Sequence, residues 1–164
     1  MQGLSRFLPL KARYLPSDLK QWTTDVEVCD LNAGILPDRY LALCDVVTLL
    51  GVVERIDDLD WLFAALARRA ERLIVTYHCA DTAPTRLAGW INAYTMAELS
   101  AKLTTAGYRI EYSEMFGDQT IFVARSSLFG ESQKRERKAA QSKSRIAPSR
   151  KTIARRLVAK FIRR

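Results

Sequence analysis

Hydrophobic positions in the first part of the chain fall into short runs that alternate with segments of helical spacing. Residues 45–50 (DVVTLL) and 73–77 (LIVTY) are apolar and rich in β-branched side chains, which is typical of buried parallel strands. Two shorter runs, at residues 12–16 and 26–30, predict two more strands ahead of them.

The segments between these runs have the periodicity of helices. Apolar residues recur every three or four positions over residues 58–72, and Asp57 or Asp58 can cap the N-terminus of this helix. A second helix is predicted at residues 96–106, where Thr95 and Glu98 have the spacing of a capping box.

Two last strands, at residues 108–115 and 120–124, are joined by a turn containing a Gly-Asp pair, which predicts an antiparallel hairpin. Strands that alternate with helices indicate an α/β fold with a mostly parallel sheet. Sheets of this kind bind ligands outside the carboxyl ends of their strands, so candidate site residues are sought there.

The charge of the chain is unevenly distributed. Residues 131–164 contain 13 Lys or Arg and 2 Asp or Glu, a net charge of +11, whereas residues 1–130 carry a net charge of −3. We therefore expect a domain over residues 1–126 and a basic tail over residues 127–164. The tail should be disordered except for an amphipathic helix at residues 149–164, where apolar residues form a stripe between basic ones.

Composition excludes several classes of protein. No run of about 18 uncharged apolar residues is present, and the N-terminal residues lack the apolar core and cleavage site of a signal peptide. The expected location is cytoplasmic, or peripheral to a membrane through the tail. Cys29, Cys44 and Cys79 stand apart in the sequence, so we expect small buried side chains and neither disulfides nor a metal site.

Four segments carry a resemblance to a known family. They read YLPSDL, CDLNAGILPD, CDVVTLLGVVERIDDLDWLFAAL and QTIFVAR. The third, a strand beginning at Asp45, then Val-Val-Glu-Arg and an acidic pair, is the most specific. In this order and spacing, residues 14–125 resemble the later part of a class I S-adenosylmethionine-dependent methyltransferase of the small type 11 kind. The resemblance implies a Rossmann-like fold and S-adenosylmethionine as the cofactor.

The resemblance also implies roles for individual residues. Asp18 matches the acidic residue that holds the cofactor's ribose hydroxyls, because a carboxylate can accept two hydrogen bonds from a diol. Asp30, with the backbone of Leu31, matches the site of the adenine amino group, and Leu50 and Gly51 match the segment along the methionine part. The alternatives are local: Asp18 can cap a helix, and Asp30 can close a turn.

One part of the family pattern does not occur in these residues. In the family a first strand and a glycine-rich loop precede everything matched here, and the chain contains no Gly-x-Gly sequence. We therefore expect an N-terminally incomplete domain that lacks a strand between the strands at 12–16 and 45–50. Three explanations stay open: a start further upstream, closure by pairing of those two strands, or a decaying remnant.

Other residues have two interpretations each. His78, the one histidine, follows the 73–77 strand and could act as a general base or be a polar loop residue. Tyr77, Trp90 and Tyr94 could line an acceptor pocket or belong to the core. Glu54 is expected at the rim of the pocket without a chemical role.

Three functions follow in order of preference. The first is a methyltransferase with an unidentified acceptor and unassigned catalytic residues. The second is an inactive fragment or pseudoenzyme. The third is an interaction module whose basic residues 131–164 bind nucleic acid or an anionic membrane surface.

A peptide of residues 149–164 tests the tail. It should be mostly unfolded in buffer, because isolated helices of about 16 residues are marginal in water. Helix gained with anionic vesicles but not with DNA, measured by circular dichroism at low salt, is the outcome expected for a membrane-facing stripe. A response to DNA alone indicates nucleic acid, and no response leaves the tail a role in solubility only.

Overall fold

The structure is a computed structural model that describes residues 8–83 and 85–130. The chain divides into one unit that ends at Phe129 and another that begins at Gly130, and the fold below is that of the first unit. The predicted tail helix at residues 149–164 lies outside the described residues. Among the helices that are described, none is long and apolar enough to cross a membrane.

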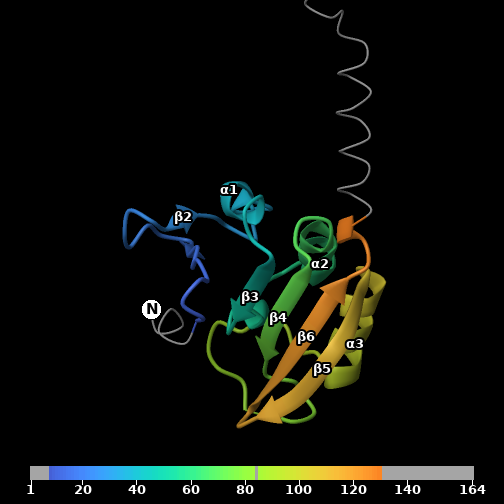
Figure 1. Ribbon diagram of the computed structural model, residues 1–164. Coiled ribbons are helices and arrows are strands. Elements are labelled where there is room, and N and C mark those ends of the chain that lie inside the picture. Colours follow the sequence, from blue (N-terminus) through green and yellow to red (C-terminus); the bar gives the residue numbers. More distant parts are fainter. Residues whose placement is uncertain (1–7, 84, 131–164) are drawn as a thin grey trace, which may run out of the picture. The chain divides into compact units, whose positions relative to one another are not determined.

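A four-stranded sheet forms the centre of this unit (Figure 1). Its strands lie in the order β3 (Val46–Leu50), β4 (Arg72–Tyr77), β6 (Gln119–Ser126) and β5 (Tyr108–Phe116). β3 and β4 are parallel, and β6 is antiparallel to both of its neighbours. The α/β class and the C-terminal hairpin are thus confirmed, in a sheet that mixes parallel and antiparallel pairs.

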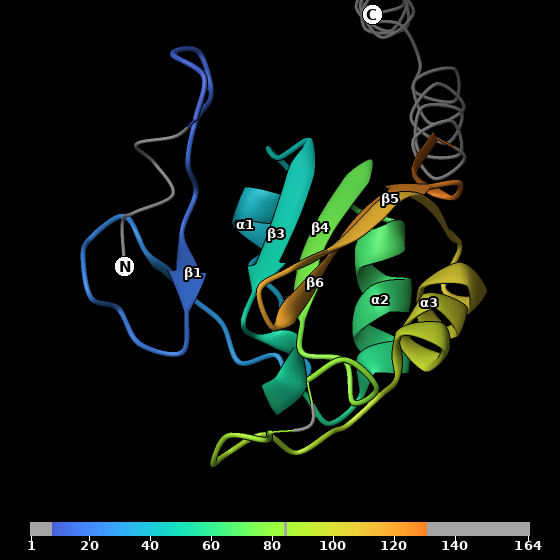
Figure 2. The same cartoon turned by 90° about the horizontal axis from the view of Figure 1, so that it is seen from below.

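Two helices cover one face of this sheet (Figure 2). α2 (Leu59–Ala67) is capped by Asp58, whose side chain accepts a hydrogen bond from the N–H of Trp61 at 2.8 Å. It ends earlier than the predicted residue 72, because Arg72 is already paired with Val46 as the first residue of β4.

The second of these helices, α3 (Met96–Thr105), starts as predicted. The Thr95 hydroxyl accepts from the N–H of Glu98 at 3.2 Å, and the Glu98 carboxylate accepts from the N–H of Thr95 at 2.8 Å. The Glu98 carboxylate also accepts from the Thr95 hydroxyl at 2.9 Å, and the bonds that it accepts from the N–H and the hydroxyl of Thr95 lower the pKa of Glu98. The capping box predicted from the sequence is therefore confirmed.

The core lies between this helical layer and the alternate residues of the strands that face it. Leu73, Val75 and Tyr77 of β4 and Phe122 and Ala124 of β6 are all buried. The residues between them point to the opposite face, where side chains are more exposed. Buried Cys29 and Cys79 behave as small apolar side chains, and burial raises the pKa of both thiols.

The first described strands form a separate parallel pair of two residues each, β1 (Ser17–Asp18) and β2 (Glu27–Val28). The strand predicted at residues 12–16 is wrong, because the strand itself is Ser17–Asp18. Pro16 has no N–H to donate and contributes only its carbonyl, which accepts from the N–H of Glu27 at 3.0 Å. β2 falls within the predicted 26–30. Over the described residues β1 does not pair with β3, so closure of the sheet by these two strands is not observed.

Two short helical turns were not predicted. α1 (Asp38–Leu41) and the 3-10 turn η2 (Val53–Arg55) contain four and three residues. A single turn is too short to establish a helical period in the sequence, so hydrophobic patterning cannot reveal it.

Gly107 provides a test of the packing between α3 and the end of β6. It has φ +96°, and a Cβ atom there would lie 2.7 Å from Leu128 Cδ1. We expect Gly107→Ala to destabilise the protein by about 2–3 kcal/mol, through left-handed strain and overpacking. Gly117→Ala is the control, because Gly117 has φ +65° but no atom within 4 Å of its Cβ position. If both variants lose the same free energy of unfolding, measured with urea, the clash with Leu128 is absent.

Candidate functional site

Parallel pairing places the ends of β3 and β4 side by side. β3 ends at Leu50 and continues through Gly51 into η2, whereas β4 ends at Tyr77 and continues directly into His78. The N–H of Gly51 donates to the Thr76 hydroxyl at 3.0 Å and so links the two strand ends. The candidate site is built on this carboxyl edge.

A buried acid and the histidine meet there. Glu54, in η2, is fully buried, and its Oε1 lies 2.8 Å from His78 Nδ1 and accepts from the N–H of His78 at 3.0 Å. The second carboxylate oxygen, Oε2, is buried and has no hydrogen-bond partner among the described residues. A buried carboxylate is costly unless it is bonded, so this pair is a strong local constraint.

Three further side chains surround the imidazole of His78. Asp118 Oδ2 lies 3.4 Å from Nε2, on the side away from Glu54, and Gln119 Nε2 lies 3.4 Å from Nδ1. The Trp90 ring packs on the imidazole with 4.4 Å between ring centroids. His78 therefore lies between a buried carboxylate near Nδ1 and an exposed carboxylate near Nε2.

The loop that carries Trp90 is fixed to η2 and β4 by hydrogen bonds. Asn92 donates to the carbonyls of Val53 and Ile56 at 2.8 and 2.9 Å and accepts from the Tyr77 hydroxyl at 2.6 Å. Burial raises the pKa of Tyr77, which keeps its proton available for this bond. Arg86 packs over the Trp90 ring and donates to the carbonyl of His78 at 3.0 Å.

Of the aromatic residues weighed from the sequence, Trp90 alone contacts His78 through its ring in the described structure. Tyr77 is fully buried in the core, and Tyr94 packs against the core from its edge. Glu54, expected at a pocket rim, is instead the buried partner of the histidine. One feature of the sequence could have predicted this contact. Glu54 follows one predicted parallel strand and His78 follows the next, and the carboxyl ends of neighbouring parallel strands lie side by side.

The aspartates nominated for the cofactor make local bonds. Asp18 Oδ1 accepts from the N–H of Leu19 at 2.7 Å, and Oδ2 accepts from Trp22 Nε1 at 3.1 Å. Asp30 Oδ1 accepts from the N–H groups of Asn32 and Ala33 at 3.0 and 3.2 Å. Asp30 therefore closes a turn after β2, as its local alternative predicted. No helix follows Asp18, so its alternative role as a helix cap is wrong, and its two bonds hold the loop after β1 instead.

Hydrogen bonds join the loops that carry these nominated residues. Cys29 is the residue before Asp30, and its N–H donates to the carbonyl of Asp18 at 2.9 Å. Asn32 donates to the carbonyl of Arg55 at 2.9 Å and accepts from the N–H of Asp57 at 3.0 Å. The loops after β1, β2 and β3 thus form one connected edge.

The remaining nominated residues differ in exposure. Leu31 is partly buried against the core, whereas Leu50 is 44% exposed at the end of β3. Gly51 has φ +65°, and a Cβ atom there would meet nothing within 4 Å. A side chain is thus disfavoured at Gly51 by backbone conformation, not by lack of space. No group of three or more potential metal ligands occurs in the described part of the chain.

Comparisons with known proteins give structural matches only. No protein-family model and no curated protein matches the sequence. A riboflavin-analogue dimethyltransferase, RosA from Streptomyces davawensis, matches 63% of this chain and 34% of its own, with 18% identity and a TM-score of 0.49. The mitomycin 7-O-methyltransferase MmcR matches 51% of this chain and 30% of its own, with 21% identity and a TM-score of 0.45.

A third solved structure, PigF with S-adenosylhomocysteine, matches 62% of this chain and 35% of its own at 16% identity and a TM-score of 0.48. The chain thus spans about a third of the length of these solved structures. At these identities and TM-scores the matches do not establish a family.

The Glu54–His78 pair can be tested by stability. Glu54→Ala removes the acceptor of a buried N–H and leaves a cavity, so we expect a loss of about 3 kcal/mol in urea unfolding. Glu54→Gln retains one acceptor oxygen and should lose less. The control is Glu114→Ala on the exposed part of β5, expected to change stability by less than about 0.5 kcal/mol. A similar small effect for Glu54→Ala would contradict the buried pair.

Proposed function

We propose that this chain forms part of a methyltransferase that uses S-adenosylmethionine, with the cofactor along the connected edge after β1, β2 and β3. One observation carries the proposal. The residues that the sequence resemblance nominates lie at the ends of β1 and β3 (Asp18 and Leu50) or in the loops that follow β2 and β3 (Asp30, Leu31 and Gly51), and hydrogen bonds join these segments.

The turn bonds of the aspartates are compatible with this role. An ionised carboxylate offers about four lone-pair positions, and each of these carboxylates uses two of them in its turn. Asp18 can therefore still accept from ribose hydroxyls and Asp30 from an adenine amino group. The turns also hold each carboxylate in one orientation, which reduces the entropy lost on binding.

The other end of the edge suits the amino-acid part of the cofactor. Exposed Leu50 offers apolar contact, and the open space beside Gly51 lets a ligand approach the backbone. When bound, S-adenosylmethionine supplies an electrophilic methyl group. His78, supported by Glu54, could hold the proton that a hydroxyl acceptor releases, and Trp90 would flank that acceptor.

An inactive fragment or pseudoenzyme is the second candidate. The specific observation in its favour is the absence of a Gly-x-Gly sequence from the 164 residues, since such a loop lies along the amino-acid end of the cofactor in the resembled family. Loss of that contact should cost several kcal/mol, where about 1.4 kcal/mol is tenfold in affinity. We therefore expect binding by this chain to be weak.

Titration of the 164-residue chain with S-adenosylmethionine and S-adenosylhomocysteine, followed by backbone amide NMR, tests the site. Saturable shifts should be confined to the loops holding Asp18, Asp30 and Gly51, with a dissociation constant of roughly 1 mM. No shift, or shifts elsewhere, would overturn the proposed site. A micromolar constant at these amides would support the site and contradict the expected weakness.

Variants identify the groups responsible. Asp30→Asn keeps the turn bonds but removes the charge, so binding should weaken several-fold, as hydrogen bonds to ionised acceptors are about twice as strong as neutral ones. Asp18→Ala should weaken binding at the ribose end. Asp38→Asn is the matched control, because Asp38 lies on α1 and pairs with Arg69. Unchanged affinity in both site variants would refute the assigned roles.

A further inference from the structure

Arg86 is half-buried, whereas the other residues of the segment 85–89 are exposed. Its guanidinium lies over the Trp90 ring, with 4.7 Å between Cζ and the ring centroid. It also donates from Nη1 to the carbonyl of His78 at 3.0 Å and from Nη2 to the carbonyl of Asn92. One planar group thus joins the end of β4, the indole ring and the residue that anchors the loop to η2.

These contacts match the shape of an arginine side chain. A guanidinium is planar, carries its N–H donors in a fixed fork and stacks on aromatic faces, whereas a lysine ammonium is a compact point charge. Among the described residues, no ion pair includes Arg86. Its donors and its charge are therefore directed at two backbone carbonyls and an aromatic ring, which is an arrangement that fixes geometry.

The Trp90 ring is the group that Arg86 and His78 share. The imidazole packs on the indole with 4.4 Å between ring centroids and an angle of 39° between the planes. Glu54 and Asp118 contact the imidazole at its nitrogen atoms, so they hold its edges. Within the described part of the chain, the indole of Trp90 supplies the one ring contact of the imidazole. The plane of the imidazole therefore depends on Trp90 and, through it, on Arg86.

We propose that Arg86 is a positioning residue for His78. It holds the Trp90 ring against the imidazole and so fixes the plane in which Nε2 is presented, while Nδ1 faces the buried Glu54 at 2.8 Å. The inference rests on the proposed function in one respect, which is that His78 holds the proton of a hydroxyl acceptor. The contacts themselves involve neither cofactor nor acceptor, so they are tested in the absence of both.

Proton NMR of the full 164-residue chain provides the test, because His78 is the only histidine in the sequence and its imidazole C–H signals are unambiguous. In the parent chain, nuclear Overhauser effects should join these protons to the Trp90 indole. The indole ring current should also shift the imidazole signals away from their positions in Trp90→Leu. If the parent chain shows neither effect, the proposal is overturned.

Substitution of Arg86 separates positioning from support of the backbone. Arg86→Ala should lose most of the ring-current shift at His78. Arg86→Lys should lose most of it too, because an ammonium group cannot cover the ring and bond both carbonyls at once. In the double variant with Trp90→Leu, the imidazole signals should match those of Trp90→Leu alone, since both residues act through one contact.

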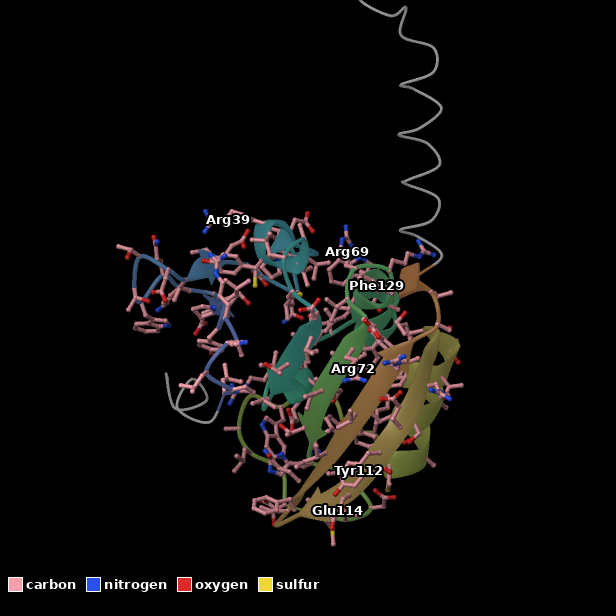
Figure 3. The ribbon with its side chains drawn as sticks, in the orientation of Figure 1. Arg39, Arg69, Arg72, Tyr112, Glu114 and Phe129 are labelled. Atoms are coloured by element: carbon pink, nitrogen blue, oxygen red, sulfur yellow. The ribbon has the colours of Figure 1, made fainter. Side chains whose placement is uncertain are left out.

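Arg39→Ala is the matched control, because Arg39 lies over the Tyr40 ring at 4.9 Å and belongs to α1 (Figure 3). It should leave the His78 signals unchanged. Parent-like His78 signals in Arg86→Ala, even with a lower stability in urea, would show that Arg86 supports only the backbone and would overturn the proposal. An equal change in Arg39→Ala would overturn it as well. If Arg86→Ala does not fold, Arg86→Lys decides by the same criteria.

Discussion

The parallel pairing of β3 with β4 is the constraint on which the rest of this unit depends. Its register runs from Val46 opposite Arg72 to Leu50 opposite Thr76, so the two chains leave the sheet at the same level. Glu54 lies four residues after Leu50 and His78 lies two residues after Thr76, so the pairing brings these two side chains from distant parts of the sequence into contact. The same pairing forces α2, the crossover between the strands, onto the face where the core forms.

Burial of Glu54 explains why the turn after β3 is so densely bonded. Burial of a carboxylate with one unpartnered oxygen lowers the stability of the fold. Hydrogen bonds from the surrounding loop to the backbone at η2 and the residue after it offset this loss. Asn92 donates to the carbonyls of Val53 in η2 and of Ile56 just after it, and the N–H of Ile91 donates to the carbonyl of Glu54 at 2.9 Å. Such a polar cluster at the strand ends holds the Glu54–His78 pair in one geometry.

Sequence patterning predicted those elements whose own residues decide their structure. Enough periodic apolar positions, or a complete capping box, occur within each of the elements that were predicted from the sequence. These elements are β3, β4, α2, α3 and the hairpin. β1 and β2 pair over only two residues each, so tertiary contacts and not propensity set their limits. The nominated aspartates were located correctly at strand ends, but their turn bonds depend on backbone geometry that the sequence does not encode in a pattern.

The partnership of Glu54 with His78 was missed for a related reason. Each residue lies in a different loop, and only the register of the two strands places them together.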